Sequence, residues 1–196
     1  KKRAPLIPDL LGTGLTLFAA DGGTGKSSVC YELAEAITTG GKFADTFQTK
    51  QGRVLFIQVD EGDDEADMKW EIMMFNPDHT KLRMEWEFNK TDIPELLQLI
   101  DEVTPDLIIF DSLFTIAGGQ MNPKDAEFAL FLYRLKRIST TKQVAIIMTH
   151  HTRKKDDKKP ELTANDIYGT VYLKNSATDV WGYWKEIGER GEKIYN

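Results

Sequence analysis

A glycine-rich stretch that ends in lysine and serine is the feature of this chain that most directly suggests chemistry. Its residues are Ala20, Asp21, Gly22, Gly23, Thr24, Gly25, Lys26, Ser27 and Ser28. Glycines let backbone N–H groups turn inward around a triphosphate, and a lysine at this position reaches the β- and γ-phosphates. We therefore predict that Asp21 to Ser28 bind the phosphates of ATP, that Lys26 also acts in catalysis, and that Ser27 holds Mg²⁺. Ala20 stands where glycine is more usual, and a small side chain is tolerated there.

The segments on either side of this stretch have the order that a phosphate-binding loop requires. Residues 15–19 form a short apolar run that suits a buried strand, and residues 27–38 carry apolar side chains at helical spacing. A strand, a glycine loop and a helix in succession place the loop at the helix N-terminus, where the helix dipole attracts anions. The context therefore favours a nucleotide site over an accidental glycine-rich turn.

A second candidate for the nucleotide site is Asp111, which ends the apolar run 107–110. Aspartates that end apolar strands are common, and alone such a residue is more often a simple turn residue. With a phosphate loop upstream, the same residue is placed to hold the hydration shell of Mg²⁺ opposite Ser27. We therefore assign Asp111 and Ser27 to magnesium.

Acidic residues follow the second predicted strand, residues 53–59. Glu61 is the candidate general base if that strand lies near the strand that precedes the phosphate loop, and Asp60 and Asp63 are alternatives with the same chemistry. The other interpretation is that these carboxylates cap the helix predicted from residue 65. Both interpretations can hold for different members of the cluster.

Polar residues also follow the predicted strand 144–148. Thr149 and His150 should emerge at the sheet edge where ligands of open α/β sheets bind, so either can contact the γ-phosphate or the attacking water. We predict a catalytic role for His150. A zinc site is the alternative, but Cys30 and His79 lack ligand-like spacing to the histidine pair.

Apolar runs alternate with helical patterns along the chain. Strands are predicted over 15–19, 53–59, 82–88, 107–110, 144–148 and 180–184, and helices over 27–38, 65–75, 92–103 and 126–138. Continuous apolar strands that alternate with helices are typical of parallel sheets covered on both faces. We predict an α/β fold with a mainly parallel twisted sheet and helices on both faces, in a single domain over residues 1–196.

Composition narrows the function classes. The chain is 41% hydrophobic, carries a net charge of −6 and has one cysteine, Cys30, which we expect to pack against the core. Apolar runs are too short for a membrane span, so we expect a cytoplasmic protein without a membrane partner. The acidic balance disfavours nucleic acid, which would have to meet the local basic stretch 153–159.

These motifs together resemble the RecA-like P-loop ATPase core, and within it the plasmid RepA-type hexameric replicative helicase group. Besides the phosphate loop, the resemblance rests on the segments 60–61, 110–112, 148–154, 168–170 and 175–181. It implies ATP and Mg²⁺ as cofactors, a homo-oligomer with a hexamer-like ring, and single-stranded DNA bound through the loop from Arg153 to Lys159. It also implies a basic finger from a neighbouring subunit, either on strands beyond Asn196 or supplied by Arg190 and Lys193.

Three function classes remain at this point. The favoured one is an ATP-hydrolysing motor that acts on DNA in replication or recombination. The alternative is a nucleotide-gated assembly or signalling module, KaiC-like in architecture, with slow hydrolysis. A P-loop kinase of small molecules is disfavoured, because its lid needs phosphate-clamping arginines and none cluster after Asp111.

Overall fold

The computed structural model describes residues 3–118, 126–152, 166, 171–187 and 193–195. Its centre is a six-stranded sheet in the order β5-β4-β6-β7-β1-β8, in which every neighbouring pair is parallel. The strands are β1 (Gly14–Ala20), β4 (Val54–Gln58), β5 (Leu82–Glu85), β6 (Leu107–Asp111), β7 (Ala145–His151) and β8 (Asp179–Tyr183). The predicted α/β class and parallel sheet are confirmed.

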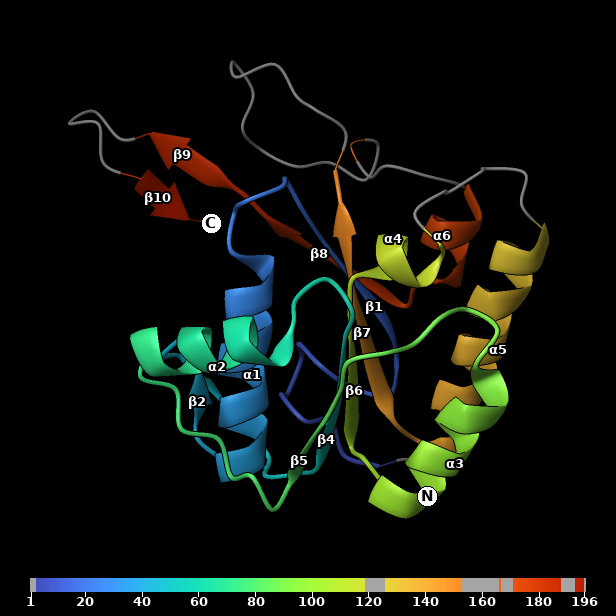
Figure 1. Cartoon of the computed structure of the whole chain (residues 1–196), viewed down its shortest axis with the longest axis horizontal. Helices are drawn as coiled ribbons and strands as arrows, with labels where there is room; N and C mark the ends of the chain where they lie inside the picture. Colours follow the sequence, from blue (N-terminus) through green and yellow to red (C-terminus); the bar gives the residue numbers. More distant parts are fainter. Residues whose placement is uncertain (1–2, 119–125, 153–165, 167–170, 188–192, 196) are drawn as a thin grey trace.

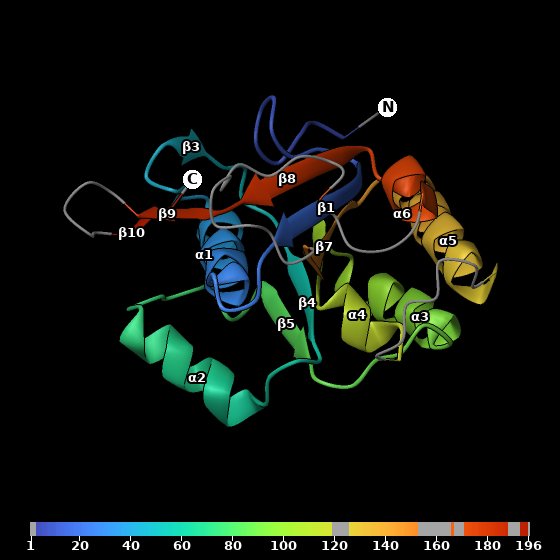
Figure 2. The same ribbon diagram turned by 90° about the horizontal axis from the view of Figure 1, so that it is seen from above.

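Helices cover both faces of this sheet (Figures 1 and 2). One face carries α1 (Lys26–Thr39) and α2 (Asp63–Ile72), and the other carries α3 (Ile93–Val103), α4 (Leu113–Ile116), α5 (Ala126–Lys142) and α6 (Val171–Ser176). Each side has its own apolar core, because successive strand residues point to opposite faces. Cys30 is buried in the core between α1 and the sheet, as predicted.

The strand order decides which polar residues meet at the carboxyl edge of the sheet. β7 lies between β1 and β6, and pairs with β1 along its whole length and with β6 over residues 145–148. The expectation that the strand before Glu61 lies near β1 is wrong, because β6 and β7 separate β4 from β1. The residues that follow β7 and β8, the two strands that flank β1, are therefore the nearest strand-end neighbours of the phosphate loop, and those that follow β6 come next.

Several shorter elements depart from the sequence prediction. β2 (Lys42–Phe43) and β3 (Phe47–Gln48) form a small hairpin in what was predicted as a polar connection, and α4 was not predicted. Beyond β8, β9 (Lys185–Ile187) pairs antiparallel with β10 (Lys193–Tyr195). α2 begins two residues earlier than predicted, directly after Gly62. Among the described residues, every helix is too short or too polar to cross a bilayer.

Candidate nucleotide-binding site

The predicted phosphate loop connects the end of β1 to the start of α1. Gly23 and Gly25 have φ angles of 71° and 94°, a backbone region that favours glycine. Among the described residues, a Cβ atom added at Gly22, Gly23 or Gly25 would meet nothing within 4 Å. The loop is held from within by Thr24, whose hydroxyl donates to the carbonyl oxygen of Asp21 at 2.8 Å. The loop therefore has the glycine-dependent backbone conformation that is typical of a phosphate-binding loop.

Lys26 begins α1 and folds back beneath the loop. Its ammonium donates to the carbonyl oxygens of Ala20 at 3.2 Å and Asp21 at 2.9 Å. The side chain is buried, and this desolvation lowers the pKa of Lys26, while the carboxylates of Asp111 and Asp21 oppose the shift. A buried cation held mainly by backbone carbonyls is suited to bind an incoming phosphate oxygen.

Asp111 lies where the predicted magnesium site should be. Its carboxylate is buried and accepts hydrogen bonds from Thr149 Oγ1 at 2.5 Å and from Gln58 Nε2 at 3.1 Å, and the nearby Ser27 side chain lowers its pKa. Burial raises the pKa of Asp111 against the effect of these donors. A cation at this position would relieve the cost of the buried charge.

The donor set at this position fits magnesium. Ser27 and Asp111, the two predicted ligands, lie close enough for the Ser27 side chain to lower the pKa of Asp111, so one ion can be held by both. A hydroxyl and one carboxylate, completed by water and phosphate oxygens, is a usual Mg²⁺ environment. No cluster of three or more His, Cys, Asp or Glu side chains suited to a metal is found in the described part of the chain, so the geometry offers nothing for the zinc alternative.

Glu61 reaches α1 although its strand is not next to β1. Its Oε2 accepts a hydrogen bond from the Tyr31 hydroxyl at 3.0 Å, and its Oε1 is ion-paired with Lys69 of α2. The Tyr31 hydroxyl in turn accepts from Gln58 Nε2 at 3.1 Å, and Gln58 donates to Asp111. One hydrogen-bonded chain therefore connects the candidate base to the candidate magnesium ligand.

The other carboxylates of the acidic cluster are placed differently. Asp60 is exposed and accepts a hydrogen bond from Thr115 at the end of α4, and its backbone N–H donates to Gln58 Oε1 at 3.0 Å. Asp63 begins α2, where a carboxylate stabilises the helix dipole. The two interpretations of the cluster thus apply to different members, and Asp60 stays an alternative base.

The two histidines at the end of β7 point to opposite faces of the sheet. Thr149 and His151 face α1, where Thr149 binds Asp111 and His151 Nδ1 lies 3.4 Å from Lys26 Nζ. His150 is completely buried and, by strand alternation, faces the side of α4 and α5. The histidine beside the predicted catalytic lysine is therefore His151, and the role predicted for His150 toward the γ-phosphate or the attacking water stays a prediction.

His151 is held as a neutral acceptor at this position. Burial lowers its pKa, and the Lys26 ammonium lowers it further. Because an ammonium has no lone pair to offer, Nδ1 of His151 accepts and its proton is on Nε2. Next along the chain, the Thr152 hydroxyl donates to the Asp21 carboxylate, which ties the end of β7 to the phosphate loop.

The residues that surround the predicted set were not themselves predicted. Tyr31, Gln58, Lys69 and His151 all contact a predicted site residue. Gln58 had the clearest signal, because it is the one amide within the apolar run of β4. The predicted DNA loop from Arg153 to Lys159, and Arg190, lie outside the described residues.

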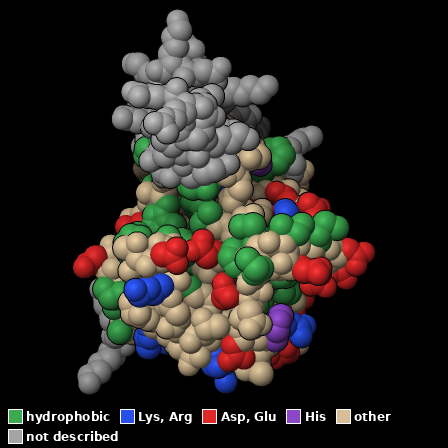
Figure 3. All heavy atoms as spheres, turned by 90° about the vertical axis from the view of Figure 1, so that its left-hand side faces the viewer, with side chains coloured by type: hydrophobic (Ala, Val, Ile, Leu, Met, Phe, Trp, Pro, Cys, Tyr) green, Lys and Arg blue, Asp and Glu red, His purple; other side chains and the backbone are tan. Residues whose placement is uncertain are grey.

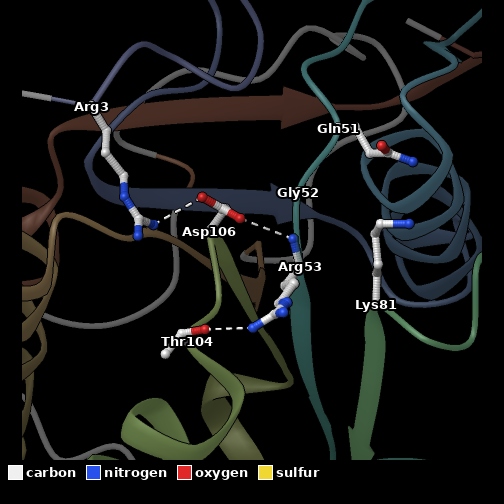
Figure 4. Close-up of a pocket in the computed structure, with 7 residues that line it drawn as sticks. All are labelled: Arg3, Gln51, Gly52, Arg53, Lys81, Thr104 and Asp106. Atoms are coloured by element: carbon white, nitrogen blue, oxygen red, sulfur yellow. Dashed lines mark hydrogen bonds and ion pairs between the residues drawn. The ribbon is translucent and has the colours of Figure 1, made fainter.

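A cavity of about 300 Å³ lies at the opposite edge of the sheet, at the amino ends of β4, β5 and β6 (Figure 4). Its lining residues are Arg3, Gln51, Gly52, Arg53, Lys81, Thr104 and Asp106. The Asp106 carboxylate accepts from Arg3 Nη1 at 2.9 Å and from the Arg53 backbone N–H at 3.0 Å. These contacts hold the N-terminal segment against the starts of β4 and β6. The cavity is therefore part of a structural contact, at the edge of the sheet opposite Lys26.

The fold and site define a P-loop ATPase core, with a glycine loop between a parallel strand and a helix, and a buried aspartate opposite the loop serine. Comparison with known families agrees with this class. Residues 1–157 match the model of the family described as AAA domain, and the chain belongs to that family. No curated protein matches the chain.

Proposed function

We propose that this chain hydrolyses ATP in the presence of Mg²⁺, and that it does so as part of an oligomer that acts on DNA. The observation that carries the ATPase proposal is the convergence of Lys26, Ser27 and Asp111 at one end of the parallel sheet. Lys26 binds the β- and γ-phosphates, and Ser27 and Asp111 hold the ion. When bound, magnesium would neutralise charge that develops on the phosphate oxygens.

Glu61 is the proposed general base for the attacking water. A carboxylate that is deprotonated at neutral pH can accept the proton of a water in line with the γ-phosphate. In its present position the Glu61 carboxylate is occupied by Tyr31 and Lys69, so it must exchange at least one partner for that water. His151, beside Lys26, is placed to sense the γ-phosphate, whereas Thr149 orients Asp111.

Nucleotide binding and turnover in a Lys26→Ala variant test the ATPase proposal. The variant loses the main point charge of the loop, so we expect no hydrolysis and weaker ATP binding. Lys50→Ala, at an exposed lysine outside the site, is the matched control and should behave as the wild type. Unchanged turnover in Lys26→Ala would refute the role of the loop.

DNA as the partner, and the RepA-type group as the nearest class, rest on the sequence resemblance. The loop from Arg153 to Lys159 carries five cations and two aspartates, so one loop alone is a weak DNA site and several brought together are a stronger one. Replacing its four lysines by alanine should leave basal ATP hydrolysis intact. It should also lower affinity for single-stranded DNA and flatten the salt dependence, since each lost phosphate contact releases about one counterion fewer.

A specific observation favours the second candidate, a nucleotide-gated switch with slow hydrolysis. The ion pair between Lys69 and Glu61 occupies the proposed base, which is consistent with a slow basal rate. DNA-stimulated ATP turnover distinguishes the two candidates. Stimulation by single-stranded DNA supports the motor, whereas a slow rate that DNA does not change supports the switch.

A further inference from the structure

The outer face of α2 exposes apolar side chains that the core does not use. Met68 and Ile72 are one helical turn apart, and Met73 and Met74 follow at the end of the helix. Ile72 is 69% exposed and Met74 is 87% exposed. Figure 3 looks at this side of the molecule and shows apolar side chains gathered next to acidic ones. Contiguous exposed apolar surface of this kind marks an interaction site more often than isolated residues do.

The same face of α2 is acidic. Asp64, Asp67 and Glu71 are exposed and lie on the outer side of the helix, beside Met68 and Ile72. The inner side is formed by Ala66 and Trp70, which are buried against α1 and the sheet. The α2 face, defined as Asp64, Asp67, Met68, Glu71, Ile72, Met73 and Met74, therefore combines apolar contact area with negative charge. A suitable partner presents apolar side chains with positive charge.

The outer face of α5 has this composition. Leu130 and Tyr133 are three residues apart and are 48% and 61% exposed. Arg134, Lys136 and Arg137 are exposed around them, and Arg137 lies in the same row one turn beyond Tyr133. The α5 face, defined as Leu130, Tyr133, Arg134, Lys136 and Arg137, therefore matches the α2 face in both apolar character and charge.

The two faces cannot meet within one molecule, because α2 and α5 lie on opposite sides of the sheet (Figures 1 and 2). We propose that the α5 face of one copy of this chain docks on the α2 face of the next copy. The contact joins two different surfaces, so it is head-to-tail and leaves an unused α2 face and an unused α5 face on every pair. Such contacts extend the assembly until it closes on itself.

This contact adjoins the nucleotide site without depending on ATP hydrolysis. Lys69 lies in the middle of α2, and its ammonium pairs with Glu61. A copy seated on the outer face of α2 therefore rests on the helix that holds the proposed base. The inference rests on the oligomer of the proposed function and names the two surfaces that would form it. Sedimentation without nucleotide tests the contact, whereas ATP turnover of Lys26→Ala tests hydrolysis, so failure of the contact is distinguishable from failure of the ATPase proposal.

Charge reversal on each face tests the proposal by sedimentation over a concentration series without nucleotide. The first variant carries Asp67→Lys and Glu71→Lys, and the second carries Arg134→Glu and Arg137→Glu. We expect concentration-dependent association of the wild type, and association at least about tenfold weaker in either variant. An equimolar mixture of the two variants should associate again, because the reversed α2 face of one fits the reversed α5 face of the other.

Two controls separate this contact from a general charge effect. Glu95→Lys with Glu102→Lys changes exposed acids of α3 by the same charge as the α2 variant, and should leave association unchanged. A single chain that carries both reversals should also regain association. The proposal is overturned if the wild type stays monomeric, if the α3 control weakens association as much as the α2 variant, or if mixing the two variants restores nothing.

Discussion

The chain of hydrogen bonds between Glu61 and Asp111 passes through one phenolic oxygen, which a single substitution removes. Tyr31→Phe deletes the hydroxyl that donates to Glu61 at 3.0 Å and accepts from Gln58 at 3.1 Å. The ring itself stays packed, with its centroid 5.1 Å from that of Phe56. Burial raises the pKa of Tyr31, so the hydroxyl keeps its proton at all ordinary pH values and donates to the carboxylate. The substitution therefore isolates the polar role of the residue.

The expected loss follows from the two bonds. A bond such as that from Gln58 contributes about 1 kcal/mol, and a bond to a charged group about 1.5–3 kcal/mol. In Tyr31→Phe, Glu61 keeps its ion pair with Lys69. Because the Glu61 side chain is 11% exposed, water replaces part of the hydrogen bond that the Tyr31 hydroxyl donated to it. We expect Tyr31→Phe to lower the free energy of unfolding by about 2 kcal/mol.

Urea unfolding measures this loss in five proteins: the wild type, Tyr31→Phe, Tyr133→Phe, Glu61→Gln and the double variant Tyr31→Phe with Glu61→Gln. Tyr133→Phe removes the same hydroxyl from an exposed position on α5 and should change the free energy of unfolding by less than about 0.5 kcal/mol. Combining Tyr31→Phe with Glu61→Gln should give less than the sum of the two single losses, because Glu61→Gln removes the charge that strengthens the bond that Tyr31→Phe deletes. A loss in Tyr31→Phe as small as that in the Tyr133 control, or strict additivity in the double variant, would refute the network.

Three further predictions concern the base, the metal ligand and a strand start. Glu61→Gln should bind Mg·ATP nearly normally and hydrolyse it at least ~10²-fold more slowly, because an amide cannot accept the proton of water; a wild-type rate would remove Glu61 from the chemistry. Burial raises the pKa of Asp111 above its ordinary value of 3.8, so its contribution to stability is present below that pH and is lost as pH rises through the folded-state pKa. Asp111→Asn should remove this part of the pH profile of unfolding measured without Mg²⁺, and an unchanged profile would contradict the assignment. Gly52→Ala should cost about 1–3 kcal/mol, because its Cβ would lie 2.9 Å from Asp106, whereas Gly62→Ala has open space and serves as the control in the same unfolding assay.

The parts of the fold that the sequence predicted are those specified locally. Each central strand is an apolar run of several residues, and such runs identify buried parallel strands without knowledge of their neighbours. The phosphate loop is equally local, because Lys26 and the glycines before it are contiguous in the chain. Asp111 was identified for the same reason, as the first polar residue after an apolar strand.

The strand order was not predictable in this way. No feature of residues 53–59 or 144–148 indicates that β7 lies between β1 and β6, or that β6 and β7 separate β4 from β1. This order follows from how the crossover helices pack, which depends on contacts across the whole chain. The prediction that Glu61 lies near the phosphate loop therefore rested on a wrong neighbour relation, although Glu61 does contact α1 through Tyr31.

The residues that contact the predicted site residues were also not predictable from local sequence. Gln58 comes from β4, Tyr31 from α1 and Lys69 from α2, so no spacing within one segment links them. His151 differs, because strand alternation already places it with Thr149 and apart from His150. Applying the two-residue period to the end of β7 would have selected the histidine that contacts Lys26.

α2 combines two properties that a helix packed only for stability does not need. Lys69 of α2 forms an ion pair with Glu61, the proposed base. The outer side of α2 leaves Met68, Ile72 and Met74 exposed beside carboxylates. Exposed apolar area of this kind lowers solubility unless a partner covers it. The proposed docking of α5 covers it, and the helix that is covered is the one that holds Glu61. The proposed docking would therefore act on the same helix whose Lys69 holds the Glu61 carboxylate.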